Sequence, residues 1–168
     1  MPILRDNTLE ILSRSPDQTL RMGHRLGELL TAGDIICLHG GLGAGKTTLA
    51  RGIGHGWGST STLNSPTYTI INVHNRKSDS QTLYHIDAYR LENPEAVFSV
   101  GFDDVFEANG PVIIEWPRRI QNILPPHYLW ITLEIDDQDD ERRVLTIESS
   151  GERHLMLLEA LRKAVFGV

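Results

Sequence analysis

Cysteine is scarce in this sequence, and long apolar runs and an excess of basic charge are missing; each of these features excludes a class of protein. Only one cysteine, Cys37, stands among the 168 residues, so no internal disulfide can form, and its place in the apolar run DIICL favours core packing. No apolar run approaches the roughly 18 residues that a membrane-spanning helix needs. The first residues, MPILRDNTLE, lack a basic region followed by an apolar stretch, so we expect no secretory signal, no membrane association and a cytoplasmic protein.

The charge balance is acidic, with 22 Asp and Glu against 16 Lys and Arg, which leaves a net charge of -6. Proteins that bind nucleic acid without a partner need a basic face that neutralises the phosphates. The balance therefore argues against direct binding of nucleic acid.

Length and composition are those of a soluble globular domain. A chain of 168 residues has the usual length of one domain, so we expect a single domain over residues 1–168. Hydrophobic residues make up 40% of it, enough for a core that hides roughly 70% of the unfolded surface.

Hydrophobic periodicity predicts an alternation of helices and strands. Strands are expected at 8–13, 34–40, 65–74, 82–87, 111–117, 128–136 and 142–150, and helices at 15–33, 45–55 and 152–166, with one or two short helices within 93–106. Ser15 is the expected N-cap of the first helix and Gly33 its expected end. The strands of 65–87 and of 128–150 read as two hairpins, the second with the acidic loop DQDDE between its strands. The pattern predicts one α/β layer structure with antiparallel additions.

Residues 38–48 read LHGGLGAGKTT and fit the phosphate-loop pattern G-x-x-x-x-G-K-S/T, with a buried strand before it and a helix after it. Glycines let successive backbone N–H groups point at one anion, and the helix start adds unpaired N–H groups and a positive dipole end. Lys46 can reach the β- and γ-phosphates, and the Thr47 hydroxyl can ligate Mg²⁺. We therefore expect a three-layer P-loop NTPase-like sandwich, with a mostly parallel central sheet and antiparallel hairpins.

Magnesium also needs a carboxylate, usually at the end of a neighbouring strand. Asp87 ends LYHID and Glu115 ends VIIE, and either could instead be a surface acid. The VIIE run is the more apolar and thus the better central strand, so Glu115 is the first choice for a role at the metal or at the attacking water.

Two other patterns in the sequence give weaker evidence of function. NRKSD at 75–79 resembles the guanine-specific N-K-x-D segment, but its spacing is wrong and it lies in a predicted hairpin turn. We read it as a solvated turn, which leaves adenine as the expected base. The histidines His39, His55, His74 and His85 lack metal-ligand spacing and are interpreted as core or surface residues.

Four stretches, GGLGAGKTTLARG, NSPTYTIINVH, LYHIDAYRL and VIIEWP, closely resemble the TsaE (YjeE) family in order and spacing. The resemblance runs from about Thr19 to about Pro125, with a looser match through the last hairpin. It implies a small bacterial ATPase required for threonylcarbamoyladenosine modification of tRNA. In that family TsaD, paired with TsaB, transfers the group. TsaE docks on the pair, and its ATP binding and hydrolysis reset the complex, so tRNA is reached only through these partners.

The resemblance also implies roles for individual residues. Those expected at the nucleotide are Gly43, Ala44, Gly45, Lys46, Thr47 and Thr48 of the loop, with Thr19, Ser65, Pro66, Thr67, Trp116 and one of Arg142 and Arg143, of which we take Arg143. Thr47 and Glu115 match the magnesium positions, and Lys46, Asp87 and Glu115 the catalytic ones. Trp116 could instead fill the core edge, and 65–67 could simply start a strand. The family usually has Asp where this chain has Gly41, which puts the family's nucleotide affinity in doubt.

Two other functions use the same loop. A small-molecule kinase would need an acceptor pocket and usually an arginine-rich lid, for which Arg118 and Arg119 are the one basic cluster in the right region. A nucleotide sensor would bind ATP without hydrolysing it. Transfer of labelled phosphate to an acceptor identifies a kinase, and an absence of phosphate release with TsaB and TsaD identifies a sensor.

Overall fold

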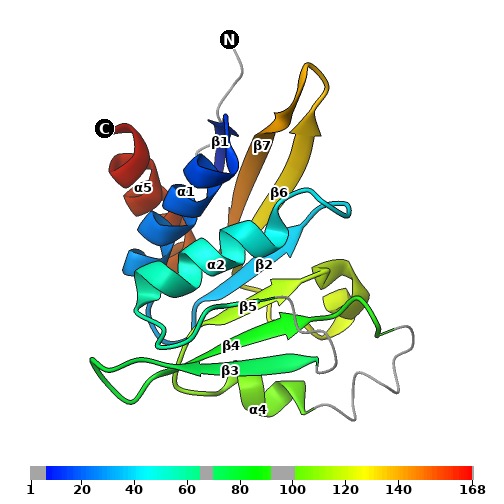
Figure 1. Ribbon diagram of the computed structural model, residues 1–168. Helices are drawn as coiled ribbons and strands as arrows, with labels where there is room; N and C mark the ends of the chain where they lie inside the picture. The colour runs from blue at the N-terminus through cyan, green and yellow to red at the C-terminus, as the bar shows by residue number, and fades with distance from the viewer. Residues whose placement is uncertain (1–6, 65–69, 92–100, 168) are drawn as a thin grey trace.

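The computed structural model describes residues 7–64, 70–91 and 101–167, and its strands form a single sheet (Figure 1). The strands are β1 (Thr8–Ser13), β2 (Ile35–His39), β3 (Ile71–Asn75), β4 (Thr82–Asp87), β5 (Val112–Glu115), β6 (Tyr128–Asp136) and β7 (Asp139–Ser150). The helices are α1 (Pro16–Leu29), α2 (Lys46–Trp57), α4 (Phe102–Phe106), the 3₁₀ helix η1 (Pro117–Ile123) and α5 (Glu152–Phe166).

The sheet has a parallel centre and antiparallel edges. Its order is β1-β7-β6-β2-β5-β4-β3, in which β6, β2, β5 and β4 pair in parallel and the other neighbours pair antiparallel. Both predicted hairpins, β3–β4 and β6–β7, are confirmed. Because β2, β4 and β5 run in the same direction, their carboxyl ends meet at one edge of the sheet.

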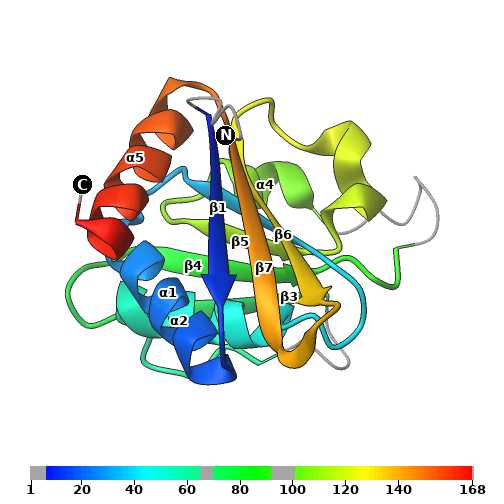
Figure 2. The ribbon, with the colours of Figure 1, turned by 90° about the horizontal axis from the view of Figure 1, so that it is seen from above.

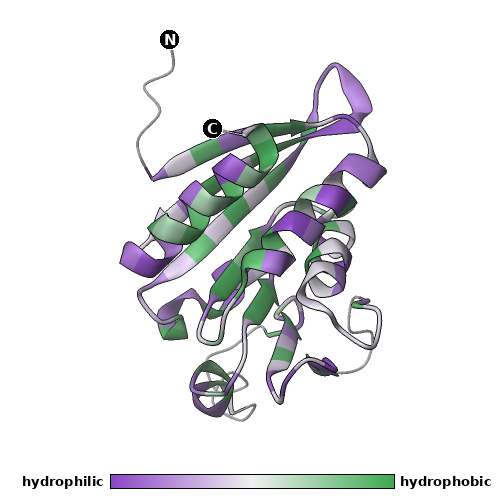
Figure 3. Cartoon of the chain, turned by 90° about the vertical axis from the view of Figure 1, so that its left-hand side faces the viewer, coloured by the Kyte–Doolittle hydropathy of each residue, from purple (hydrophilic) through white to green (hydrophobic). Residues whose placement is uncertain are grey.

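Helices cover both faces of this sheet, which confirms the three-layer fold. Figures 1 and 2 show α1, α2 and α5 along one face and α4 and η1 on the other. Each face has its own apolar core: Leu26, Ile53 and Leu158 lie in the first, and Ile86, Phe102 and Ile120 in the second. Figure 3 shows apolar residues along the strands and a hydrophilic turn between β6 and β7. None of the described helices is long and apolar enough to cross a membrane.

Several element boundaries differ from the sequence expectation. Ser15 caps α1 as predicted, with its side chain accepting from the Gln18 N–H at 3.2 Å, but the helix ends at Leu29 and not at Gly33, because Leu30 is already extended. β7 begins at Asp139, so three of the five residues of the expected acidic loop belong to the strand, and the pairing with β6 is irregular there. The helix η1 was not predicted, since PRRIQNI lacks a clear apolar period. Residues 65–69 and 92–100 of the predicted strand and short helices lie outside the described residues.

Glycines set the close approach of α1 and α2. A Cβ added at Gly27 would lie 2.0 Å from the Ile53 carbonyl oxygen, and one at Gly56 would lie 1.9 Å from the His24 carbonyl oxygen. Real Cβ atoms do not come this near to backbone, so the two helices can pack at this distance only with glycine at the contact. The contact holds α2, which carries the phosphate loop at its start, firmly against α1.

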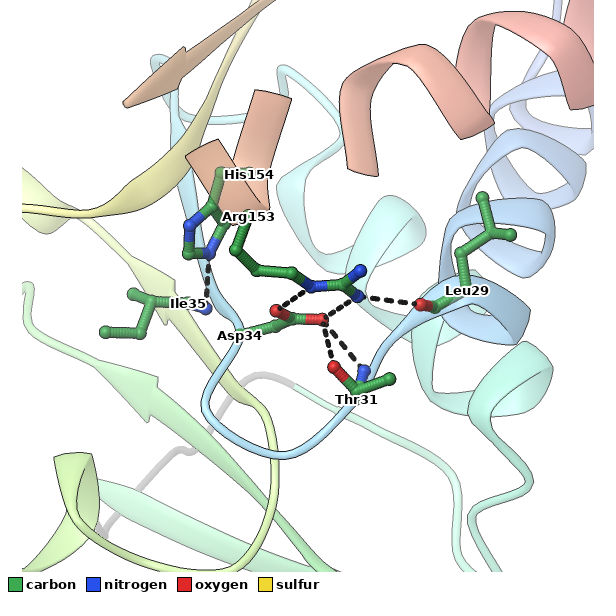
Figure 4. A network of polar contacts seen from close by, with 6 residues as sticks. All are labelled: Leu29, Thr31, Asp34, Ile35, Arg153 and His154. Atoms are coloured by element: carbon green, nitrogen blue, oxygen red, sulfur yellow. Dashed lines mark hydrogen bonds and ion pairs between the residues drawn. The ribbon is translucent and has the colours of Figure 1, made fainter. Parts of the chain in front are cut away.

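An ion pair between the buried Asp34 and the partly exposed Arg153 ties α5 to the start of β2 (Figure 4). The Asp34 carboxylate, 1% exposed, accepts from Arg153 Nε at 2.9 Å and from the Thr31 N–H at 2.8 Å. Next to it, the Ile35 N–H donates to His154 Nε2 at 3.1 Å. This network lies at the end of β2 opposite the phosphate loop, so it anchors the strand that presents the loop.

Candidate functional site

The loop between β2 and α2 folds around the start of the helix. Gly43 and Gly45 have φ angles of 75° and 103°, in the left-handed region that favours glycine. Gly45 is the N-cap of α2, and no side chain among the described residues caps this end. The first N–H groups of α2 are thus left for an anion.

A cleft of about 270 Å³ opens at this helix start. Among the described residues, its lining is Leu42, Gly43, Ala44, Gly45, Lys46, Thr47, Thr48, Glu115 and Trp116. The structure thus brings together every predicted residue of the phosphate loop with Glu115 and Trp116.

Lys46 is folded against the loop that precedes it. Its Nζ donates to the carbonyl oxygens of Gly40 and Gly41, both at 2.7 Å, and lies 4.1 Å from the centre of the Trp116 ring. Burial lowers the pKa of Lys46 below its ordinary value, while Glu115 and Asp87 act in the opposite direction. The ammonium is therefore partly desolvated and close to both acids at the sheet edge.

Glu115 and Asp87 occupy paired positions at the carboxyl ends of β5 and β4. The Thr47 hydroxyl donates to Glu115 Oε1 at 3.3 Å, so the two predicted magnesium ligands are neighbours. Asp87 Oδ1 accepts from the Tyr89 N–H at 3.0 Å. Hydroxyl and carboxylate oxygens are the donors that Mg²⁺ prefers, together with phosphate oxygens and water. The donor set of Thr47 and Glu115 thus fits this ion, and no larger cluster of His, Cys, Asp and Glu able to hold a metal occurs among the described residues.

His85 is a site residue that the sequence interpretation missed. Its Nε2 lies 2.6 Å from Glu115 Oε2, and the side chains of His85 and Glu115 are 0% and 2% exposed. The reading as a core residue is correct for its burial but overlooks this contact. The one available signal was its position two residues before Asp87, which places both on the same face of β4.

Arg143, and not Arg142, holds the phosphate loop. Its Nε donates to the Ala44 carbonyl at 3.0 Å and its Nη2 to the Gly43 carbonyl at 3.1 Å, whereas Arg142 pairs with Asp139 at 3.4 Å. Of the two arginines that the sequence left open, only Arg143 contacts the loop in the described part of the chain. The contact comes from β7, 99 residues along the chain from Ala44.

Trp116 combines the two roles considered for it. It lines the cleft and also packs against Tyr89, with the ring centres 4.9 Å apart, at the edge of the second core. Its φ of 58° is unusual for a residue other than glycine and marks a turn directly after Glu115. After this turn the indole lies against the ammonium of Lys46.

The other predicted nucleotide residues remain predictions. Thr19 is 2% exposed on α1, its hydroxyl lies 2.7 Å from Ser13 Oγ, and it is not among the described residues that line the cleft. Ser65, Pro66 and Thr67 lie outside the described residues. A Cβ at Gly41 would meet no atom within 4 Å in the described structure, so the aspartate usual in the family would fit there without a clash at Cβ.

Comparison with known proteins gives one consistent result. Residues 13–144 match the family described as threonylcarbamoyl adenosine biosynthesis protein TsaE. The tRNA threonylcarbamoyladenosine biosynthesis protein TsaE of Bacillus subtilis is 35% identical over 149 residues, 89% of this chain and 90% of that protein. The protein of the same name from a Nostoc species is 39% identical over 145 residues, 84% of this chain and 87% of its own length. The crystal structure of Bacillus subtilis YdiB superposes with a TM-score of 0.78 at 30% identity and covers 94% of this chain and 96% of its own.

Proposed function

The chain belongs to the TsaE family of tRNA threonylcarbamoyladenosine biosynthesis proteins, and from this premise we propose that it binds and hydrolyses Mg·ATP as an accessory protein of the TsaB–TsaD pair. Hydrolysis then resets the pair between turnovers. The observation that carries the proposal is the cleft at the start of α2, where Lys46, Thr47 and Glu115 face one space. The protein would act in the cytoplasm.

The loop provides the binding part of this function. The free N–H groups of α2 and the Lys46 ammonium would hold the phosphates, and Arg143 keeps the loop in shape through the Gly43 and Ala44 carbonyls. To reach a phosphate, the ammonium must leave the carbonyls of Gly40 and Gly41.

The sheet edge provides the hydrolytic part. Thr47 and Glu115 would hold Mg²⁺, and the ion would neutralise negative charge on the transferred phosphoryl group. Asp87, paired with Glu115 across β4 and β5, is the second acid and would orient the attacking water. Neither carboxylate needs to form a covalent bond, because catalysis of phosphoryl transfer is largely positioning and electrostatic stabilisation.

The acidic surface supports indirect contact with tRNA. With a net charge of -6, the chain offers little to an RNA backbone, whose binding strength comes from neutralised phosphates. We expect no gel shift of tRNA by this protein alone at physiological salt, where non-specific dissociation constants are typically about 10⁻⁴–10⁻⁶ M.

The test combines phosphate release with complex formation. Phosphate release from ATP is measured with the protein alone and with TsaB and TsaD, and size exclusion of the three proteins is run with and without ATP. We expect an ATP-dependent complex and release that rises sharply with the partners. Tight, salt-sensitive tRNA binding by the lone protein, with no complex in the mixture, would overturn the proposal. Labelled phosphate on an acceptor other than water would indicate a kinase.

A further inference from the structure

We propose that His85 is a positioning residue for the magnesium site: its imidazole holds one oxygen of Glu115 so that the other oxygen, beside Thr47, is presented to the ion. This inference rests on the proposed function, because it assumes that Mg·ATP occupies the cleft. It assigns a role to a residue that itself does not line the cleft in the described structure.

The two oxygens of Glu115 have different partners. Oε2 lies 2.6 Å from His85 Nε2, and Oε1 lies 3.3 Å from the Thr47 hydroxyl. A carboxylate only accepts hydrogen bonds, so Nε2 is the ring nitrogen that carries the proton. The short contact to a charged acceptor is of the strong, charge-assisted kind. The carboxylate is thereby fixed in rotation, with one oxygen toward the sheet interior and one toward the loop.

The position of Lys46 explains why the Glu115 carboxylate needs to be held. The Lys46 ammonium lies 4.1 Å from the ring centre of Trp116, the residue directly after Glu115, so an unrestrained Glu115 has a cation to turn toward. An ion pair of that kind would occupy both the metal ligand and the phosphate-binding lysine. In the structure His85 holds the carboxylate through Oε2, and the Lys46 ammonium rests on the carbonyls of Gly40 and Gly41.

The sheet itself holds the imidazole in place. His85 pairs with Ile113 on β5 and with Asn72 on β3, so β4 is flanked on both sides at this position. The ring is completely buried, and it lies on the same face as Asp87, two residues further along β4. A ring enclosed in this way can hold a carboxylate without a large loss of side-chain freedom on binding the metal.

His74 offers a matched control. It lies on β3 and is 5% exposed, and its Nδ1 lies within hydrogen-bond distance, 2.6 Å, of Ser61 Oγ. Burial, and then the nearby His85, lower its pKa, so the two histidines are neighbours in a similar environment. No contact between His74 and Glu115 occurs among the described residues. A loss of packing would therefore affect both positions, and a loss of metal positioning only His85.

The experiment measures metal binding without turnover. Mn²⁺ is titrated into protein saturated with a non-hydrolysable ATP analogue, and bound metal is followed by electron paramagnetic resonance. In parallel, calorimetry with EDTA gives the affinity for the analogue alone. The variants are His85→Phe, which keeps a ring but deletes the donor, His85→Gln, which can place an N–H near the former Nε2, and His74→Phe. If His85→Phe does not fold, His85→Asn replaces it, because its shorter amide stays polar but does not reach Glu115.

We expect His85→Phe to weaken Mn²⁺ binding by about ten- to hundred-fold, the usual effect of removing a group that orients a metal ligand. His85→Gln should recover most of this loss, His74→Phe should bind Mn²⁺ like the wild type, and analogue affinity in EDTA should be unchanged in all three. Wild-type Mn²⁺ affinity in His85→Phe, an equal loss in His74→Phe, or no recovery in His85→Gln would overturn the inference. If the wild-type protein binds no Mn²⁺ with the analogue, the proposed function itself fails.

Discussion

Replacing Lys46 by methionine removes the ammonium from the phosphate loop and keeps most of the aliphatic stem. In the structure this ammonium makes two 2.7 Å contacts to the carbonyls of Gly40 and Gly41 and lies over the Trp116 ring. On nucleotide binding it exchanges these neutral acceptors for charged phosphate oxygens. A hydrogen bond to a charged group contributes about 1.5–3 kcal/mol, so the variant should bind Mg·ATP about ten- to hundred-fold more weakly.

Titration calorimetry with Mg·ATP measures this loss, and two further variants show its cause. Lys46→Ala also removes the stem, which is buried with the rest of a side chain that is only 6% exposed. If the charge dominates, Lys46→Met and Lys46→Ala lose similar affinity. Lys77→Met, at an exposed lysine in the β3–β4 turn, removes the same charge outside the site and should leave the affinity unchanged. Equal affinity of Lys46→Met and wild type would refute the assignment of the loop as the phosphate site.

Three further outcomes are expected. Glu115→Gln keeps the size of the side chain but loses its charge, so ATP binding should persist in calorimetry while partner-stimulated phosphate release is suppressed; near-normal release would move the metal role to Asp87. Gly27→Ala forces a Cβ to within 2.0 Å of the Ile53 carbonyl oxygen and should lower the free energy of unfolding in urea by about 1–3 kcal/mol, whereas an unchanged midpoint would show that α1 and α2 can separate freely. Burial lowers the pKa of His154 below its ordinary value of 6.5, so the folded state binds fewer protons than the unfolded one. The stability that this neutral imidazole contributes is therefore full above pH 6.5 and is lost as the pH falls toward the folded-state pKa. The melting temperature should fall between pH 7.5 and pH 5.5, and His154→Gln, which can still accept from the Ile35 N–H but does not titrate, should reduce that fall; an unaltered pH slope would contradict the assignment.

Much of the fold could be read from hydrophobic periodicity because its elements are separated by strong local signals. Ser15 followed by Pro16 specifies the start of α1, and the uninterrupted apolar run of β2 specifies a buried central strand. The errors lie where local signals are weak or conflict. Gly33 reads as a helix end, but α1 stops at Leu29, where Leu30 turns into extended backbone that leads to β2.

The phosphate loop is determined by the sequence alone because all its parts are consecutive. Gly40 to Thr48 form a turn and the first turn of α2, so a short stretch of residue types suffices to place N–H groups, lysine and hydroxyl around one anion. Strand ends gave Asp87 and Glu115 as acids at the sheet edge, and the more apolar VIIE run made Glu115 the first choice, but the contact between Glu115 and Thr47 is shown only by the structure. That choice depends on strand order, which no short stretch specifies.

Tertiary structure alone decided the contacts between distant segments. Arg143 reaches the loop, and Arg142 does not, because β7 presents alternate side chains to opposite faces. His85 meets Glu115, 30 residues away, because β4 and β5 pair in parallel and in a register that sets Asp87 beside Glu115. The physical reason is that a one-residue change of register would turn every side chain of a strand to the other face. The burial of the central strands β2 and β5 on both faces selects the register and, with it, the neighbours of Glu115.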